Sequence, residues 1–87
     1  MKTAVVTGAS SGIGKEICRM LNGHGIRVYG IGRTFCEDQA AQTPLFIPII
    51  CDLSDTAALT GLIRRILSET PVDILINNAG TAYYGPH

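Results

Sequence analysis

The sequence has no long hydrophobic run. It has 87 residues, of which 46% are hydrophobic, but no apolar stretch approaches the roughly 20 residues needed to cross a bilayer. The opening stretch MKTAVVTGAS has only a short apolar run, Ala4 to Val6, which is too small for the core of a signal peptide. We therefore expect no membrane-spanning segment and a cytoplasmic location.

Charge is also scarce. Only 16% of the residues are charged and the net charge is +0, whereas ordinary soluble domains carry about 25 % charged residues. No basic run is present, and no aromatic residues interleave with basic ones, so we expect no nucleic-acid partner. The low charge fits two arrangements, a sheet buried on both faces or an apolar surface that needs a partner.

The cysteines lack the spacings that are typical of a metal site or of a redox-active pair. The chain has 3 cysteines, Cys18, Cys36 and Cys51, and none forms a C-x-x-C pair. An odd count without such pairs is typical of reduced thiols in a cytosolic protein. We expect no metal site.

Strand and helix patterns alternate along the chain. Short apolar runs predict strands at 3–7, 27–31, 45–50 and 72–76, and apolar residues at helical spacing predict two helices, one after the first strand and one before the last. Ser54 is the expected N-cap of the second helix. Strands alternating with helices form parallel sheets through right-handed crossovers. The sequence therefore predicts an α/β fold, a partial doubly wound (Rossmann-like) sheet in the order 3-2-1-4 with helices on both faces. Pro48 fits this order because a proline in a strand belongs at a sheet edge.

A glycine-rich turn, TGASSGIG, joins the first strand to the first helix. Gly8 allows a tight reversal, and Gly12 and Gly14 leave room for a ligand and for close packing of helix on strand. The first helical turn offers free N–H groups and the positive end of a helix dipole, which together bind anions. Ser10 and Ser11 add hydroxyl groups. A pyrophosphate is the expected guest, although the same glycines also fit a purely structural turn.

Two motifs together resemble the short-chain dehydrogenase/reductase family. The first is the spacing Gly8-x-x-x-Gly12-x-Gly14 after Thr7, and the second is NNAG, residues 77–80, after the fourth strand. The resemblance covers all 87 residues. It implies a dinucleotide-binding part, with the glycine loop holding the cofactor pyrophosphate and Asn77 bracing the sheet. The residues it places at the cofactor are Gly8, Ser10, Ser11, Gly12, Ile13, Gly14, Asp52 at the adenine, Leu53, Asn78, Ala79 and Gly80. Asp52 also fits a simpler role, as a carboxylate at the entry to the second helix.

The end of the second strand favours NADP(H) over NAD(H). An NAD site needs a carboxylate there for the ribose 2′-OH, whereas an NADP site needs an arginine nearby. Here Gly32 stands in place of the acid, and Arg33 and Thr34 follow it. The alternative for Arg33 is a solvent-exposed charge on a loop without a role in binding. An arginine holds a 2′-phosphate through charge-assisted, often bidentate hydrogen bonds.

The catalytic pair that the family uses, Tyr-x-x-x-Lys, is absent. The only lysines, Lys2 and Lys15, precede every tyrosine. We therefore interpret residues 1–87 as the N-terminal part of an NADP(H)-dependent oxidoreductase acting on carbonyls or alcohols, with the catalytic part absent and this chain inactive by itself. A non-catalytic nucleotide-binding or oligomerising module is the alternative, and a methyltransferase or flavodoxin-like domain fits the paired motifs poorly. The strand at 72–76 is then an exposed apolar edge, which predicts a homo-oligomer formed through that edge.

Overall fold

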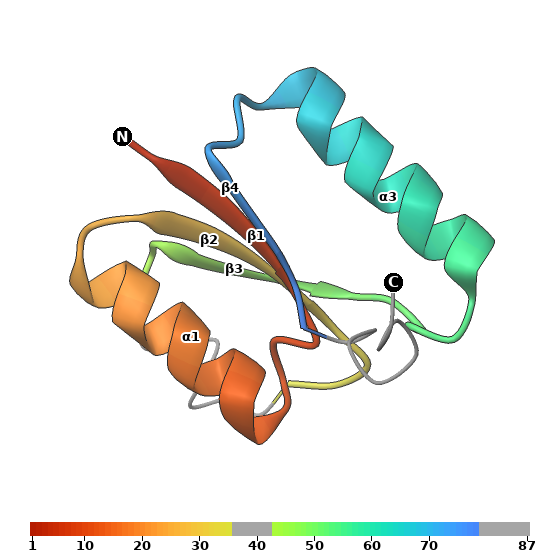
Figure 1. Ribbon diagram of the computed structural model, residues 1–87, viewed down its shortest axis with the longest axis horizontal. Coiled ribbons are helices and arrows are strands. Elements are labelled where there is room, and N and C mark those ends of the chain that lie inside the picture. The colour runs from red at the N-terminus through yellow and green to blue at the C-terminus, as the bar shows by residue number, and fades with distance from the viewer. Residues whose placement is uncertain (36–42, 79–87) are drawn as a thin grey trace, which may run out of the picture.

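The computed structural model describes residues 1–35 and 43–78, which form a parallel sheet with one helix on each face (Figure 1). The elements follow in the order β1 (Thr3–Thr7), α1 (Gly12–Gly23), β2 (Arg27–Gly32), β3 (Phe46–Ile50), α3 (Thr56–Glu69) and β4 (Ile74–Asn77). The strand order is β3-β2-β1-β4, and every neighbouring pair is parallel. The predicted fold class and strand order are confirmed. In these ranges no helix is both long and apolar enough to cross a membrane.

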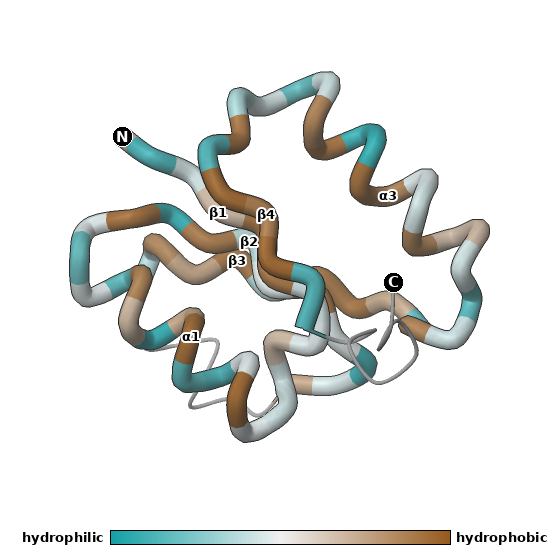
Figure 2. Tube along the Cα trace, in the orientation of Figure 1, coloured by the Kyte–Doolittle hydropathy of each residue, from teal (hydrophilic) through white to brown (hydrophobic). Residues whose placement is uncertain are grey.

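β1 is the centre of the sheet and has no face left for solvent. All of its residues are buried, and Figure 2 shows hydrophobic residues along the neighbouring strands as well. Ala4 and Val6 point to the α1 side, whereas Val5 points to the α3 side. This double burial explains why the strand has no alternating polar residues, as expected of a parallel strand covered on both faces.

Each helix contributes one apolar stripe to a separate half of the core. On one face, Cys18 and Leu21 of α1 pack with buried residues of β1 and β2 and with Phe46 of β3. On the other face, Ile66 of α3 packs with Val5 and Ile31. Because the four strands are parallel, their carboxyl ends meet at one edge of the sheet, and the loops that follow these ends come together there.

Pro48 lies on β3 at an outer edge of the sheet, as predicted. Three of the predicted strands have boundaries that are wrong by one or two residues. β2 ends at Gly32 rather than residue 31, because Gly32 still pairs with Ile50 of β3. β3 begins at Phe46 rather than residue 45, although the Leu45 carbonyl still accepts a hydrogen bond from Val28 N at 2.7 Å. β4 covers Ile74–Asn77 rather than 72–76, because Val72 packs into the α3 side of the core and only the later residues join the ladder with β1.

The N-cap of α3 is Asp55, not Ser54 as predicted. The helix begins at Thr56, and the Asp55 carboxylate accepts a hydrogen bond from Ala58 N at 3.1 Å. Ser54 lies one residue too early for that geometry, since a capping side chain reaches the second or third N–H group inside the helix. Its hydroxyl and its N–H are instead bound to the Asp52 carboxylate, at 2.7 and 3.0 Å.

Candidate functional site

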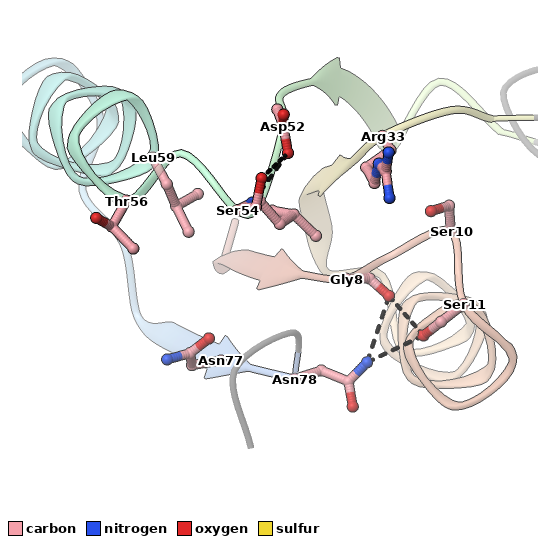
Figure 3. A pocket seen from close by; sticks show the side chains of 11 residues that line it. Gly8, Ser10, Ser11, Arg33, Asp52, Ser54, Thr56, Leu59, Asn77 and Asn78 are labelled. Carbon is pink, nitrogen blue, oxygen red and sulfur yellow. Dashed lines mark hydrogen bonds between the residues drawn. The ribbon is translucent and has the colours of Figure 1, made fainter. Parts of the chain in front are cut away.

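A cavity of about 750 Å³ lies at the carboxyl edge of the sheet. Figure 3 shows its lining side chains, which come from the glycine loop, the ends of β2 and β4 and the segment entering α3. The lining residues are Gly8, Ser10, Ser11, Arg33, Asp52, Leu53, Ser54, Thr56, Leu59, Asn77 and Asn78. In a doubly wound sheet this edge is where ligands bind.

The glycine loop is closed by its own hydrogen bonds into a fixed turn. Gly8 has φ 68, a left-handed conformation that glycine adopts without strain. Ser11 is the N-cap of α1: its hydroxyl donates to Gly8 O at 2.8 Å and accepts from Gly14 N at 3.3 Å. The turn is therefore held by hydrogen bonds between residues of the loop and of the first turn of α1. The predicted contact of Ser11 with a ligand stays a prediction beside this structural role.

The loop is also fastened to the end of β4. Nδ2 of Asn78 donates to Gly8 O at 3.3 Å and to Ser11 Oγ at 3.1 Å (Figure 3). Beneath the loop, a Cβ at position 14 would collide with the carbonyl of Gly8 and meet Nδ2 of Asn78 at 3.0 Å. Only glycine fits at position 14, so helix, loop and strand approach one another as closely as backbones can.

Two helices present their N-termini at this edge, but only one of them is free of acidic side chains. α1 has no acidic residue in its first turn and is capped by the neutral Ser11. α3 is capped by the Asp55 carboxylate. Because the positive end of a helix dipole attracts anions and a carboxylate repels them, the α1 end is the better place for a phosphate group.

Arg33 and Asp52 give the far side of the cavity one charge of each sign. Both side chains are exposed and belong to the lining. Hydrogen bonds from the Ser54 hydroxyl and the Ser54 N–H, with a smaller contribution from the positive charge of Arg33, hold the pKa of Asp52 below its usual value. Asp52 is therefore an acceptor at neutral pH, and part of its acceptor capacity is used by Ser54, as in the helix-entry role considered from the sequence.

Most of the predicted site residues lie at the cavity. Those in its lining are Gly8, Ser10, Ser11, Arg33, Asp52, Leu53 and Asn78. Those outside its lining are Gly12, Ile13, Gly14 and Thr34, of which Ile13 is 71% exposed on the first turn of α1. Ala79 and Gly80 lie outside the described residues.

Four lining residues were missing from the predicted site: Ser54, Thr56, Leu59 and Asn77. The first three enter or begin α3, and the signal that could have found them is the position of a helix start directly after a strand end. Asn77 was expected to brace the sheet, and the hydrogen bond from Thr7 Oγ1 to its Oδ1, at 2.8 Å, agrees with that role. Among the described residues no group of His, Cys, Asp and Glu could hold a metal ion.

A family model described as short chain dehydrogenase matches residues 2–87. The chain therefore belongs to the short-chain dehydrogenase/reductase family and corresponds to its N-terminal part. Among curated relatives, a short chain dehydrogenase of Pseudocercospora fijiensis is 38% identical over 98% of this chain and 30% of its own length. An NADPH-dependent 3-dehydrocapnine reductase of Ornithobacterium rhinotracheale is 36% identical over 99% of this chain and 32% of its own length.

Solved structures agree with the fold. Actinorhodin polyketide ketoreductase, in a structure with NADPH, is 34% identical over 91% of this chain and 33% of its own, with a TM-score of 0.68. The Bordetella bronchiseptica enzyme WbmH, in complex with NAD+, has a TM-score of 0.71 over 91% of this chain and 26% of its own, at 23% identity. The chain thus spans about a third of the length of the relatives that it matches. The capnine reductase is named as NADPH-dependent and the ketoreductase structure contains NADPH, whereas WbmH was solved with NAD+.

Proposed function

We propose that this chain is the NADP(H)-binding N-terminal part of an oxidoreductase that transfers hydride between a nicotinamide cofactor and a carbonyl or alcohol. The observation that carries the proposal is the arrangement of the glycine loop. The acid-free N-terminus of α1 and the guanidinium of Arg33 belong to the same edge of the sheet, and Gly32 supplies no competing carboxylate. When bound, the cofactor would donate the hydride to a carbonyl or accept it from an alcohol.

The residues of the chain bind and orient the cofactor in this proposal. The N–H groups of the first turn of α1 hold the pyrophosphate, and Arg33 pairs with the 2′-phosphate. Asp52, ionised at neutral pH, accepts from the adenine amino group with the lone pairs that Ser54 leaves free. Asn78 keeps the loop at a fixed height above β4 through its bonds to Gly8 and Ser11. None of these groups moves a proton at the substrate.

The cofactor preference is tested by titrating the chain with NADPH and with NADH. Arg33→Asp should weaken NADPH binding by about tenfold or more, since hydrogen bonds to charged groups contribute about 1.5–3 kcal/mol, and should leave NADH binding nearly unchanged. Arg64→Asp is the matched control, because Arg64 is exposed on α3 and is not part of the cavity lining. Equal affinities of the unmutated chain for both cofactors would refute the preference.

We further propose that the isolated chain is inactive and cytoplasmic. Its sequence contains no Tyr-x-x-x-Lys pair, and an odd number of cysteines without C-x-x-C spacing fits a reducing compartment. The missing Tyr-x-x-x-Lys pair also favours the second candidate function, a non-catalytic nucleotide-binding or oligomerising module. The proposed inactivity is tested by measuring NADPH oxidation with a panel of carbonyl compounds. Any turnover above the rate with the cofactor alone would contradict it.

Self-association through β4 is also proposed. Among the described residues β4 is an outer strand with no neighbour on its far side, and Leu75 on it is 51% exposed, so this edge carries an apolar side chain. Two copies meeting edge to edge form a two-fold dimer with antiparallel β4 strands. Sedimentation at tens of micromolar should show a dimer that Leu75→Lys dissociates. Ile50→Lys is the control, since Ile50 is an exposed aliphatic residue on the opposite edge strand. A monomer for the unmutated chain contradicts this proposal.

A further inference from the structure

The end of β2 is in close contact with the glycine loop. Gly32 is buried, and a Cβ added to it would lie 2.7 Å from Ser10 Oγ and 3.1 Å from Ser10 Cβ. The same Cβ would also lie 3.1 Å from a ring carbon of Phe35. The first distance is shorter than carbon and oxygen atoms tolerate without a bond, and the other two are tight. Ser10 thus takes up the space into which a side chain at position 32 would point.

Both neighbours of Gly32 are held by contacts of their own, although the Ser10 side chain is exposed and its hydroxyl can rotate. Phe35 packs edge-on against Phe46, with ring centroids 5.8 Å apart, and Phe46 is itself 5% exposed in the core. Ser10 follows Ala9, which is fully buried and whose N–H donates to Ile31 O on β2 at 3.1 Å. The loop is therefore fixed to β2 directly beside the position in question. Rotating the Ser10 hydroxyl away would relieve the contact with Oγ but not the contact with Cβ.

The two loop serines differ in what their hydroxyls do. Ser11 donates to Gly8 and accepts from Gly14, so it maintains the turn. In the described part of the chain the Ser10 hydroxyl makes no hydrogen bond, and Ser10 lines the cavity together with Arg33 (Figure 3). Ser10 is thus not needed to hold the loop together, but it fills the space beside the cofactor-facing end of β2.

We propose that Ser10 is a specificity-determining residue that acts by packing. It excludes a carboxylate from position 32, the place where a doubly wound fold uses an acid to bind the ribose 2′-OH of NAD(H). The end of β2 then contributes only the positive charge of Arg33 to the cavity, and the carboxylate of Asp52 comes from the segment after β3. This proposal rests on the proposed function, because it concerns the choice between two dinucleotides. Its consequence is that Gly32→Asp alone does not create an NAD(H) site, and that the change succeeds only when Ser10 is also reduced to glycine.

The packing is tested first without any cofactor. Gly32→Ala should lower the melting temperature by about 5 °C or more, because overpacking costs about 1–3 kcal/mol in a domain of this size. In the Ser10→Gly background the same substitution should cost clearly less. Gly61→Ala is the control, since a Cβ at Gly61 on α3 meets no atom within 4 Å. Equal losses in both backgrounds would overturn the proposal, even if cofactor binding had never been observed.

The choice of cofactor is tested by titration of four chains with NADH and NADPH: unmutated, Gly32→Asp, Ser10→Gly and the double variant. Gly32→Asp alone should lose NADPH affinity and gain less than about threefold in NADH affinity, whereas the double variant should gain about tenfold for NADH. Gly61→Asp should change neither affinity. A full gain of NADH affinity in Gly32→Asp with Ser10 intact would overturn the role of Ser10. Equal affinity of the unmutated chain for both cofactors would instead count against the proposed function.

Discussion

The side-chain amide of Asn78, at the end of β4, donates a hydrogen bond to the carbonyl of Gly8, which lies 70 residues earlier in the chain, at 3.3 Å. The same amide reaches Ser11 Oγ at 3.1 Å. One side chain therefore connects the last described strand to both the turn and the cap of α1. The shape of the glycine loop depends on β4 being in place.

Replacing Asn78 with aspartate should destabilise the fold. Asn78→Asp keeps the shape of the side chain but substitutes a carboxylate oxygen for the donor that faces the Gly8 carbonyl. We expect the free energy of unfolding to fall by about 1–3 kcal/mol, the cost of leaving a partly buried acceptor without its donor. Urea denaturation followed by circular dichroism measures it, and Asn78→Ala separates the loss of the bond from the added repulsion. An unchanged midpoint for Asn78→Asp would show that the amide does not hold the loop.

Two glycines should respond in opposite directions to alanine. Gly14→Ala places a methyl group against the Gly8 carbonyl, so we expect a loss of about 3 kcal/mol or more and a large fall in melting temperature. Gly61→Ala lies on an open face of α3 and should raise stability by about 0.5–1 kcal/mol, because alanine restricts the unfolded chain. Thermal unfolding of both variants checks this, and similar melting temperatures for the two would contradict the close contact at Gly14.

The Cys18 thiol should be unreactive in the folded protein. Burial raises its pKa to about 11, only partly offset by a backbone hydrogen bond, and the residue is 2% exposed. Alkylation at pH 8 followed by peptide mass analysis should modify Cys51, which is partly buried, well before Cys18. Rapid modification of Cys18 under native conditions would show that the core beneath α1 opens easily.

The same thiol gives a stability change with a defined sign. A pKa raised on folding means that the stabilising effect is fully present below the unfolded value, about 8.5, and is lost as the pH rises toward about 11. Cys18→Val cannot ionise at this position. Across that interval the free energy of unfolding of the unmutated chain should therefore fall relative to that of Cys18→Val. A difference between the two proteins that stays constant with pH would contradict this expectation.

Much of this architecture was predictable because it follows from local patterns. Alternating strands and helices predict the order β3-β2-β1-β4, and Pro48 indicates one edge of the sheet. The glycine spacing likewise located the turn that lines the cavity. The start of α3 was misassigned because Ser54 and Asp55 are both good caps, and the contact of Asp52 with Ser54 decided between them.

The remaining features depend on contacts between distant parts of the chain. The bonds from Asn78 to Gly8 and Ser11 join residues 70 and 67 positions apart, and the crowding of Ser10 against Gly32 arises only when the loop settles on β2. Composition and spacing carry no information about such distances. The motif could therefore indicate residues that line the cavity, but not that Ser11 closes the turn while Ser10 lies against the end of β2.

β1 is covered on both faces and paired on both edges, so we expect its amide protons to exchange with solvent only when the whole molecule unfolds. The exchange rate of these amides therefore reports global stability. A ligand that binds only the native state slows that exchange in proportion to its occupancy. Deuterium uptake at Val5 and Val6 can consequently measure coenzyme affinity even when a weak complex gives no heat signal and no turnover.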